Sequence, residues 1–204
     1  MDRGVLRGEL MKLIDDYMAM LKKGLDSINE MEFVKTVDRL RQAHRLGRTV
    51  FTAGNGGSAA IAEHFSCDHS KGVATNTDHF PKLISLPSNM SLMTAIANDC
   101  GYDEVFSHQI NLHGERGDVL VVVSSSGNSP NIVKAAQAAY DIGMDVIAFT
   151  GFDGGDVLNY ANFKFHIPIK NYGVVEDCHQ ILAHMMAQHI RTLDTVVPMD
   201  RVKL

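Results

Sequence analysis

The sequence predicts an α/β fold: a three-layer α/β/α sandwich around a five-stranded parallel sheet, preceded by N-terminal helices. Three observations support this prediction. Short apolar runs alternate with helical segments from Arg48 onward, as in parallel sheets joined by right-handed crossovers. Residues 119–123 are all Val or Leu, which is typical of a strand buried on both faces. The 204 residues contain no long linker, so one main domain is expected.

Two amphipathic helices are predicted before the first strand. Apolar side chains recur at helical spacing over residues 9–28 and again over 31–46. In the first segment they are Leu10, Leu13, Ile14, Tyr17, Met18, Leu21, Leu25 and Ile28. We expect residues 1–46 to pack on the main domain and in an oligomer, 47–195 to form that domain, and 196–204 to form a C-terminal tail.

The remaining elements follow from the same periodicities. Strands are predicted at 49–53, 83–86, 119–123, 145–150 and 163–168. Helices are predicted at 58–70, 91–98, 103–112, 131–142, 155–160 and 175–193. Open sheets of this kind bind ligands at the carboxyl ends of their strands, so the loops after the strands are the first places to search for function.

Composition narrows the classes of partner. The net charge is −5, which gives no electrostatic reason to expect nucleic acid or an anionic membrane. No apolar run approaches the ~20 residues that span a bilayer. The cysteines at 67, 100 and 178 are far apart and form no Cys-x-x-Cys pair. We therefore expect reduced thiols and a cytoplasmic location, with no nucleic acid and no membrane as partner.

The first loop of interest follows the strand at 49–53. Gly54-Asn55-Gly56-Gly57-Ser58 runs directly into an alanine-rich helical segment. Free backbone N–H groups and the positive end of a helix dipole suit a phosphate. No Lys follows the glycines, so this is not a Walker A loop. The alternative is a tight turn that only joins strand to helix.

The second loop follows the strand at 119–123. It carries Ser124, Ser125, Ser126 and Ser129, and a helix is predicted directly after Pro130. Hydroxyl and backbone N–H groups can hold a phosphate without a positive charge or a metal. A Ser-Pro helix cap would explain the last serine but not the other three. The loop therefore favours a sugar-phosphate site.

Together the two loops resemble the sugar isomerase (SIS) domain family, and most closely its phosphoheptose isomerase branch. The shared motifs are Gly54-Asn55-Gly56-Gly57-Ser58, Asn98-Asp99-x-Gly101-Tyr102, Gly117-Asp118-Val119-Leu120 and the segment from Ser124 to Ser129. The resemblance implies a flavodoxin-like five-stranded sheet and a homotetramer with active sites between subunits. It also implies conversion of sedoheptulose 7-phosphate to D-glycero-D-manno-heptose 7-phosphate.

The resemblance assigns roles position by position. Substrate contacts fall on Asn55, Gly56, Gly57, Ser58, Asp68, Asn98, Asp99, Ser124, Ser125, Ser126, Ser129 and Glu176. The catalytic pair falls on Asp68 and His184. One divalent metal, expected to be Zn²⁺, would be held by His64, Asp68, Glu176 and His184. The implied chemistry is aldose–ketose isomerisation through a cis-enediol, with Asp68 as base and His184 as acid.

Three departures from the family pattern leave the particular sugar open. Asp68 replaces a Glu, and Glu176 replaces a Gln. The segment at 172–175 is one residue short and lacks an Asp that contacts substrate in the family. Isomerisation of another ketose phosphate is one alternative. The other is a non-catalytic adaptor or sugar-phosphate sensor, which would have no need of His64, Asp68 and His184.

Spacing supports part of the expected metal site. His64 and Asp68 are four residues apart, so they share one helix face, and their side chains suit zinc. Glu176 and His184 are separated by eight residues, about 12 Å of straight helix. Either Glu176 precedes the helix or a neighbouring subunit supplies one ligand set. Gln180 and His184, four residues apart, offer another arrangement.

Overall fold

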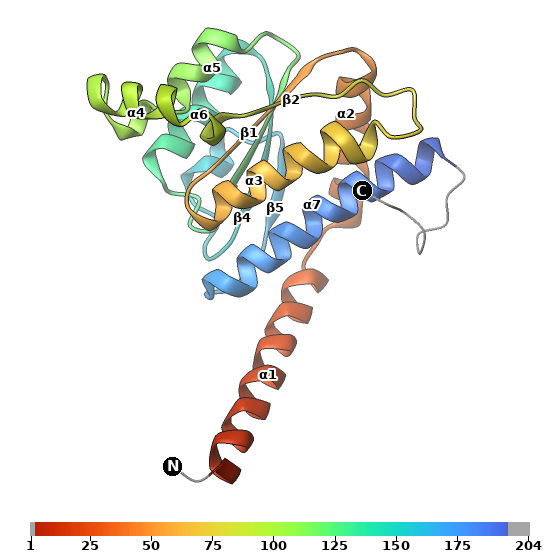
Figure 1. Cartoon of the computed structure of the whole chain (residues 1–204), viewed down its shortest axis with the longest axis vertical. Helices are drawn as coiled ribbons and strands as arrows, with labels where there is room; N and C mark the ends of the chain where they lie inside the picture. The colour runs from red at the N-terminus through yellow and green to blue at the C-terminus, as the bar shows by residue number, and fades with distance from the viewer. Residues whose placement is uncertain (1–2, 196–204) are drawn as a thin grey trace.

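The computed structural model describes residues 3–195, and the predicted tail at 196–204 lies outside them. Within the described residues, five parallel strands form one sheet in the order β2-β1-β3-β4-β5. Helices cover both faces of this sheet (Figure 1). The predicted three-layer α/β/α fold with a five-stranded parallel sheet is confirmed.

The element bounds lie close to the predicted ones. The strands are β1 (Thr49–Gly54), β2 (Lys82–Ser85), β3 (Val119–Ser124), β4 (Asp145–Thr150) and β5 (Phe163–His166). The helices are α1 (Arg3–Asp26), α2 (Glu30–Arg45), α3 (Gly57–Cys67), α4 (Met90–Asp99), α5 (Ser107–His113), α6 (Pro130–Ile142) and α7 (Tyr172–Asp194). The 3₁₀ turns are η2 (Leu86–Ser88), η3 (Tyr102–Glu104) and η4 (Asp156–Asn159).

The two cores lie on opposite faces of the sheet because side chains alternate along each strand. Val121 of β3 packs with apolar residues of α2, α3 and α7 on one face. Leu120 and Val122, the neighbours of Val121 in β3, pack with α5 and α6 on the other face. All six residues of β3 are buried, as a central parallel strand requires.

Helix α1 extends away from the body of the domain (Figure 1). Its C-terminal part is fixed to α7 through Tyr17, whose hydroxyl donates to Asp177 Oδ2 at 2.7 Å. This hydrogen bond raises the pKa of Tyr17 to about 12. Other apolar residues of α1 are more than half exposed: Leu10 at 55%, Leu13 at 62% and Met18 at 57%. The apolar stripe predicted from the sequence is therefore uncovered, within the described chain, at Leu10, Leu13, Ile14 and Met18, whereas Tyr17, Leu21, Leu25 and Ile28 pack against the core.

Two helices differ from their predicted bounds in ways that affect the candidate site. The helix predicted at 58–70 changes after Cys67 into a π-helix, η1 (Asp68–Val73). The last helix begins at Tyr172 rather than at 175, because Asn171 caps it by accepting a hydrogen bond from the backbone N–H of Val174. Among the described helices, none has the length and apolar content needed to cross a membrane.

Candidate active site

The glycine loop joins β1 to α3 and requires its glycines. A side chain at Gly54 would collide with the backbone of Ser58, and Gly56 has a φ of 54°. These constraints bring the N-terminus of α3 close to the end of β1. Ser58, in the first turn of α3, is 5% exposed. The backbone N–H groups of this turn are therefore held at the carboxyl edge of the sheet.

The serine loop leaves β3, the strand next to β1, at the same edge of the sheet. Ser124 and Ser126 stabilise the loop, because their hydroxyl oxygens accept from the backbone N–H groups of Gly127 and Asn128, both at 3.2 Å. Ser125 Oγ is buried and has no hydrogen-bond partner within the described residues. A buried hydroxyl without a partner is costly, so a ligand that bonds to it would be favoured.

The two loops enclose a hollow of about 160 Å³. Its lining consists of Asn55, Ser58, Val123, Ser124, Ser125, Ser126, Ser129, Tyr172 and Glu176. Among these lining residues none carries a positive charge, and the one ionisable carboxylate belongs to Glu176. A phosphate would be held here by hydroxyls, backbone N–H groups and two helix N-termini, and would lie away from Glu176.

Farther along α3 the structure brings together His64, Asp68 and His184. Possible metal-binding atoms of these three residues all lie within 4.8 Å of one another. Asp68 Oδ1 lies 3.3 Å from His64 Nε2, and Asp68 Oδ2 lies 3.6 Å from His184 Nε2. The two imidazoles are 3.4 Å apart at their Nε2 atoms. Three of the four predicted metal ligands thus converge from α3, η1 and α7.

The three residues fit a divalent metal. Asp68 is 6% exposed, yet its Oδ2 has no hydrogen-bond partner in the described chain. A buried carboxylate oxygen is stabilised by a cation, and two imidazoles with one carboxylate are a common zinc-binding set. Asp68 begins the π-helix η1, a type of helical irregularity that is frequent at functional sites.

Glu176, the fourth predicted ligand, lies outside this group. Glu176 and His184 belong to the same helix, α7, so the long separation expected from the sequence is present. A Cβ atom added to Gly57 would lie 2.5 Å from Oε2 of Glu176, so this carboxylate packs against the glycine loop. His184 has its own partner on α7, because Gln180 Nε2 lies 2.9 Å from His184 Nε2.

Five of the predicted substrate residues lie outside the lining of the hollow: Gly56, Gly57, Asp68, Asn98 and Asp99. Asn98 and Asp99 are at the C-terminal end of α4, where Asn98 Nδ2 donates to Asp99 Oδ1 at 2.7 Å. Conversely, Tyr172 lines the hollow although no role was predicted for it. The one sequence feature that could have indicated a role for Tyr172 is its position in the shortened segment at 172–175. Asn131 was also missed, and it contacts the Asn55 side chain from the first turn of α6.

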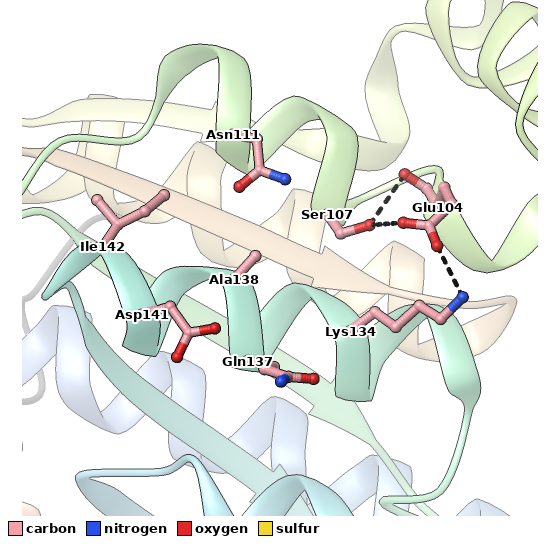
Figure 2. A pocket seen from close by; sticks show the side chains of 8 residues that line it. All are labelled: Glu104, Ser107, Asn111, Lys134, Gln137, Ala138, Asp141 and Ile142. Carbon is pink, nitrogen blue, oxygen red and sulfur yellow. Dashed lines mark hydrogen bonds and ion pairs between the residues drawn. The ribbon is translucent and has the colours of Figure 1, made fainter.

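A larger hollow of about 450 Å³ lies between α5 and α6 (Figure 2). Its lysine is already paired, because Lys134 Nζ lies 2.7 Å from Glu104 Oε1. Ser107 Oγ donates to the other oxygen of the same carboxylate at 2.6 Å. An anion here would have to compete with Glu104 for Lys134. The smaller hollow, with its unpaired hydroxyl, is therefore the better phosphate site.

Comparison with known proteins identifies the family of the chain. Residues 15–151 match the SIS domain family. The chain belongs to this family. It is 40% identical over 149 residues to a phosphoheptose isomerase of Colwellia psychrerythraea, an overlap of 72% of this chain and 76% of that one. It is 33% identical over 190 residues to a phosphoheptose isomerase of Shewanella, covering 90% and 96% of the two chains.

A solved structure extends the likeness to the fold. The phosphoheptose isomerase GmhA of Neisseria gonorrhoeae superimposes with a TM-score of 0.82 and 30% identity, covering 92% of this chain and 99% of that one. By these likenesses the chain is an isomerase, and the findings support a sugar phosphate as its substrate. The resemblance predicted from the two loops is confirmed.

Proposed function

We propose that this isomerase converts sedoheptulose 7-phosphate to D-glycero-D-manno-heptose 7-phosphate. The observation that carries the proposal is the pairing of two features on α3 and α7. A phosphate hollow lies at the start of α3, and a carboxylate–imidazole pair, Asp68 and His184, lies farther along. The named relatives from Colwellia and Neisseria, both phosphoheptose isomerases, support the choice of a heptose.

The separation of the two features suits a long sugar. Ser58, which lines the hollow, precedes His64 by six residues, so the two lie about 9 Å apart along the helix axis. A substrate with its phosphate among the serines must extend along α3 before its carbonyl carbon reaches Asp68. Because the phosphate of sedoheptulose 7-phosphate is at the far end of the chain from C1 and C2, this sugar can span the two features.

The acid–base steps follow from the placement of Asp68 and His184. Asp68 removes a proton from C1 of the ketose while His184 donates one to O2, which gives the cis-enediol. Asp68 then returns its proton to C2, and His184 takes the proton from O1, which leaves the aldose. The amide of Gln180, 2.9 Å from His184, helps to fix the orientation of that imidazole.

A divalent metal, expected to be Zn²⁺, would be held by His64, Asp68 and His184. When bound, it would polarise the carbonyl and stabilise negative charge that develops on the sugar oxygens. Glu176 is proposed to contact the sugar, because its carboxylate lines the same hollow as the serines. Asn98 and Asp99 stay predicted substrate contacts, in a position that a neighbouring subunit could complete.

The proposed assembly is a homotetramer with active sites between subunits. The exposed apolar stripe of α1 supports it, because Leu10, Leu13, Ile14 and Met18 lie uncovered along one helix. The contact of Tyr17 with Asp177 joins α1 to α7, the helix that carries His184. Packing of α1 against another subunit would therefore also stabilise the helix that carries the proposed acid.

The experiment is turnover of sedoheptulose 7-phosphate by the purified protein with added zinc, followed by proton NMR. We expect aldoheptose 7-phosphate to form, and its formation to stop in the double variant Asp68→Asn, His184→Ala. Circular dichroism shows whether that variant is folded. Chelation of the metal should lower the rate, and added zinc should restore it. A folded protein that leaves the sugar unchanged would refute the proposal.

A second candidate is isomerisation of a different ketose phosphate. Glu176 favours it, because a carboxylate in the lining of the hollow selects hydroxyl donors that an amide would not select as strongly. The same assay with pentulose and hexulose phosphates distinguishes the two candidates. A higher kcat/KM for one of these shorter sugars would replace the heptose as the proposed substrate.

A further inference from the structure

A small hydrogen-bond network fixes the side chain of Asn55 at the boundary of the two ligand loops. Asn55 Nδ2 donates to Asn131 Oδ1 at 2.9 Å, and Asn131 Nδ2 donates to Asn55 Oδ1 at 2.9 Å. The hydroxyl of Tyr102 also donates to Asn55 Oδ1, at 3.0 Å. Asn131 is 2% exposed, so the paired amides are anchored in the protein interior.

The network joins three segments that are far apart in sequence. Asn55 belongs to the glycine loop after β1, Asn131 to the first turn of α6 after the serine loop, and Tyr102 to η3. The amide pair spans 76 residues of sequence. It therefore holds the glycine loop at a fixed distance from the serine loop, across the hollow that both loops line.

The network also decides what Asn55 can offer to a ligand. An asparagine amide has two acceptor lone pairs and two N–H donors. Asn131 and Tyr102 together occupy both lone pairs of Asn55 Oδ1, and Asn131 Oδ1 takes one of the two N–H groups. One N–H group is left. Because Asn55 lines the phosphate hollow, this N–H group is its remaining hydrogen-bonding capacity there.

We propose that Asn131 and Tyr102 are positioning residues that fix Asn55 as a hydrogen-bond donor toward an oxygen of the bound sugar phosphate. This inference rests on the proposed function only for the class of ligand. Without the network, the amide of Asn55 could turn and present its oxygen to the phosphate, which would repel it. Asn131 and Tyr102 thus act on binding through Asn55 and do not touch the reacting atoms.

The test is a double-mutant cycle between Asn55 and Asn131. Affinity for sedoheptulose 7-phosphate is measured by calorimetry in an Asp68→Asn background, which stops turnover during the titration. We expect Asn131→Ala to weaken binding about tenfold, the upper range for one hydrogen bond. In the presence of Asn55→Ala, the same substitution should change binding by less than about twofold, because the Asn55 amide that Asn131 orients is no longer there.

Kinetics in the otherwise unchanged protein give a second readout. Asn131→Ala should raise KM by a similar factor and leave kcat within about twofold, a split expected when binding alone is affected. Tyr102→Phe keeps the ring and removes only the donor, so we expect a smaller rise in KM. The matched control is Asn111→Ala, an exposed asparagine in the groove between α5 and α6, which should leave KM unchanged (Figure 2).

Several results would overturn the inference. One is a loss of affinity from Asn131→Ala that is the same in the protein with Asn55 as in the Asn55→Ala variant. Another is the absence of measurable binding of the sugar phosphate to the Asp68→Asn protein with Asn55 and Asn131 intact. If Asn131→Ala does not fold, the exposed Tyr102→Phe variant takes its place in the cycle. Binding with a coupled cycle but no turnover would refute the proposed reaction and leave this inference standing.

Discussion

The protein contains two groups of histidine and aspartate residues that differ in how far their imidazoles are exposed. The site group consists of His64, Asp68 and His184, and the buried group consists of His44, His69, His79 and Asp194. The groups meet at adjacent residues of the π-helix η1, Asp68 and His69. In the site group the side chains of His64 and His184 are 48% and 37% exposed. In the buried group His44 and His69 are 1% and 0% exposed.

The partners within each group also differ. In the buried group each histidine pairs through one ring nitrogen: His44 Nε2 lies 2.9 Å from His69 Nδ1, and His79 Nε2 lies 2.7 Å from Asp194 Oδ2. Arg41 adds a two-point contact to Asp194, at 2.6 and 3.0 Å. In the site group, Asp68 Oδ2 has no hydrogen-bond partner. Similar residue types therefore form a structural cluster in one place and a candidate ligand site in the other.

The pKa values of the buried group are shifted by burial and by ion pairing. Burial lowers the pKa of His44 to about 3, with a smaller contribution from His79, and lowers the pKa of His69 well below its usual range. The Arg41 guanidinium, with His79 as a further donor, holds the pKa of Asp194 well below its usual range. The lowered pKa values keep His44 and His69 neutral in the protein interior near neutral pH. Ring nitrogens without a hydrogen-bond partner in the described chain also occur in the buried group, at His44, His69 and His79, so exposure of the imidazoles is what distinguishes the site group.

The largest expected effect that tests this comparison is Asp68→Asn in the site group. We expect kcat to fall by about 10³-fold, within the range for loss of a general base, because the amide cannot accept the proton. The unfolding free energy should change by less than about 1 kcal/mol, since Asp68 Oδ2 makes no hydrogen bond. Asp68→Glu, which restores the residue usual in the family, should keep most of the activity. NMR assays and urea denaturation measure the two quantities.

The second test reverses the pattern in the buried group. Asp194→Asn removes the charge that pairs with Arg41, Arg45 and His79, and the Asp194 side chain is only 14% exposed. We expect a loss of about 2–4 kcal/mol in unfolding free energy, because the largely buried Arg41 loses its counter-charge. The control is Asp26→Asn, which breaks the exposed ion pair with Lys22 and should cost less than about 1 kcal/mol. A large fall in kcat for Asp194→Asn without a measurable loss of unfolding free energy would contradict a structural role for the buried group.

The smallest of the three effects concerns pH. The unfolded chain binds a proton at His44 below pH about 6.5, whereas the folded chain does so only near its pKa of about 3. Stability from this group is therefore complete above pH about 6.5 and is lost as the pH falls toward 3. Between pH 7 and 5 the loss should be about 2 kcal/mol. In His44→Gln the unfolding free energy, measured by denaturation, should fall by about 2 kcal/mol less between pH 7 and 5 than in the unchanged protein. The same fall in both proteins would contradict this prediction.

Much of the fold could be predicted because its signals are local. The Val and Leu run of β3, the glycines after β1 and the capped starts of the helices each act within a few residues. The π-helix was missed because nothing in the spacing of 58–70 indicates a change of hydrogen-bonding pattern after Cys67. The early start of α7 was missed because the Asn171 cap acts on the backbone of Val174 without changing the apolar period.

The candidate site could be predicted only in part, for the same reason. Both ligand loops follow directly from strand–loop–helix order, and His64 and Asp68 follow from their spacing on one helix. The contact of His64 with His184 joins residues 120 positions apart, and here the family resemblance supplied what spacing could not. The contacts of Asn131 with Asn55 had no local signal, since an asparagine after Ser-Pro reads as part of a helix start.

By itself, the sequence determined the layered α/β fold, the position of the two ligand loops at one edge of the sheet, and the absence of a Walker A lysine. The tertiary structure decided which of the histidines converge, that Glu176 lies against the glycine loop, and that the Asn55 amide is left with one free N–H group. The physical reason is range. Periodicity and turn chemistry act along a few residues of chain, whereas burial and pairing depend on which helices pack together.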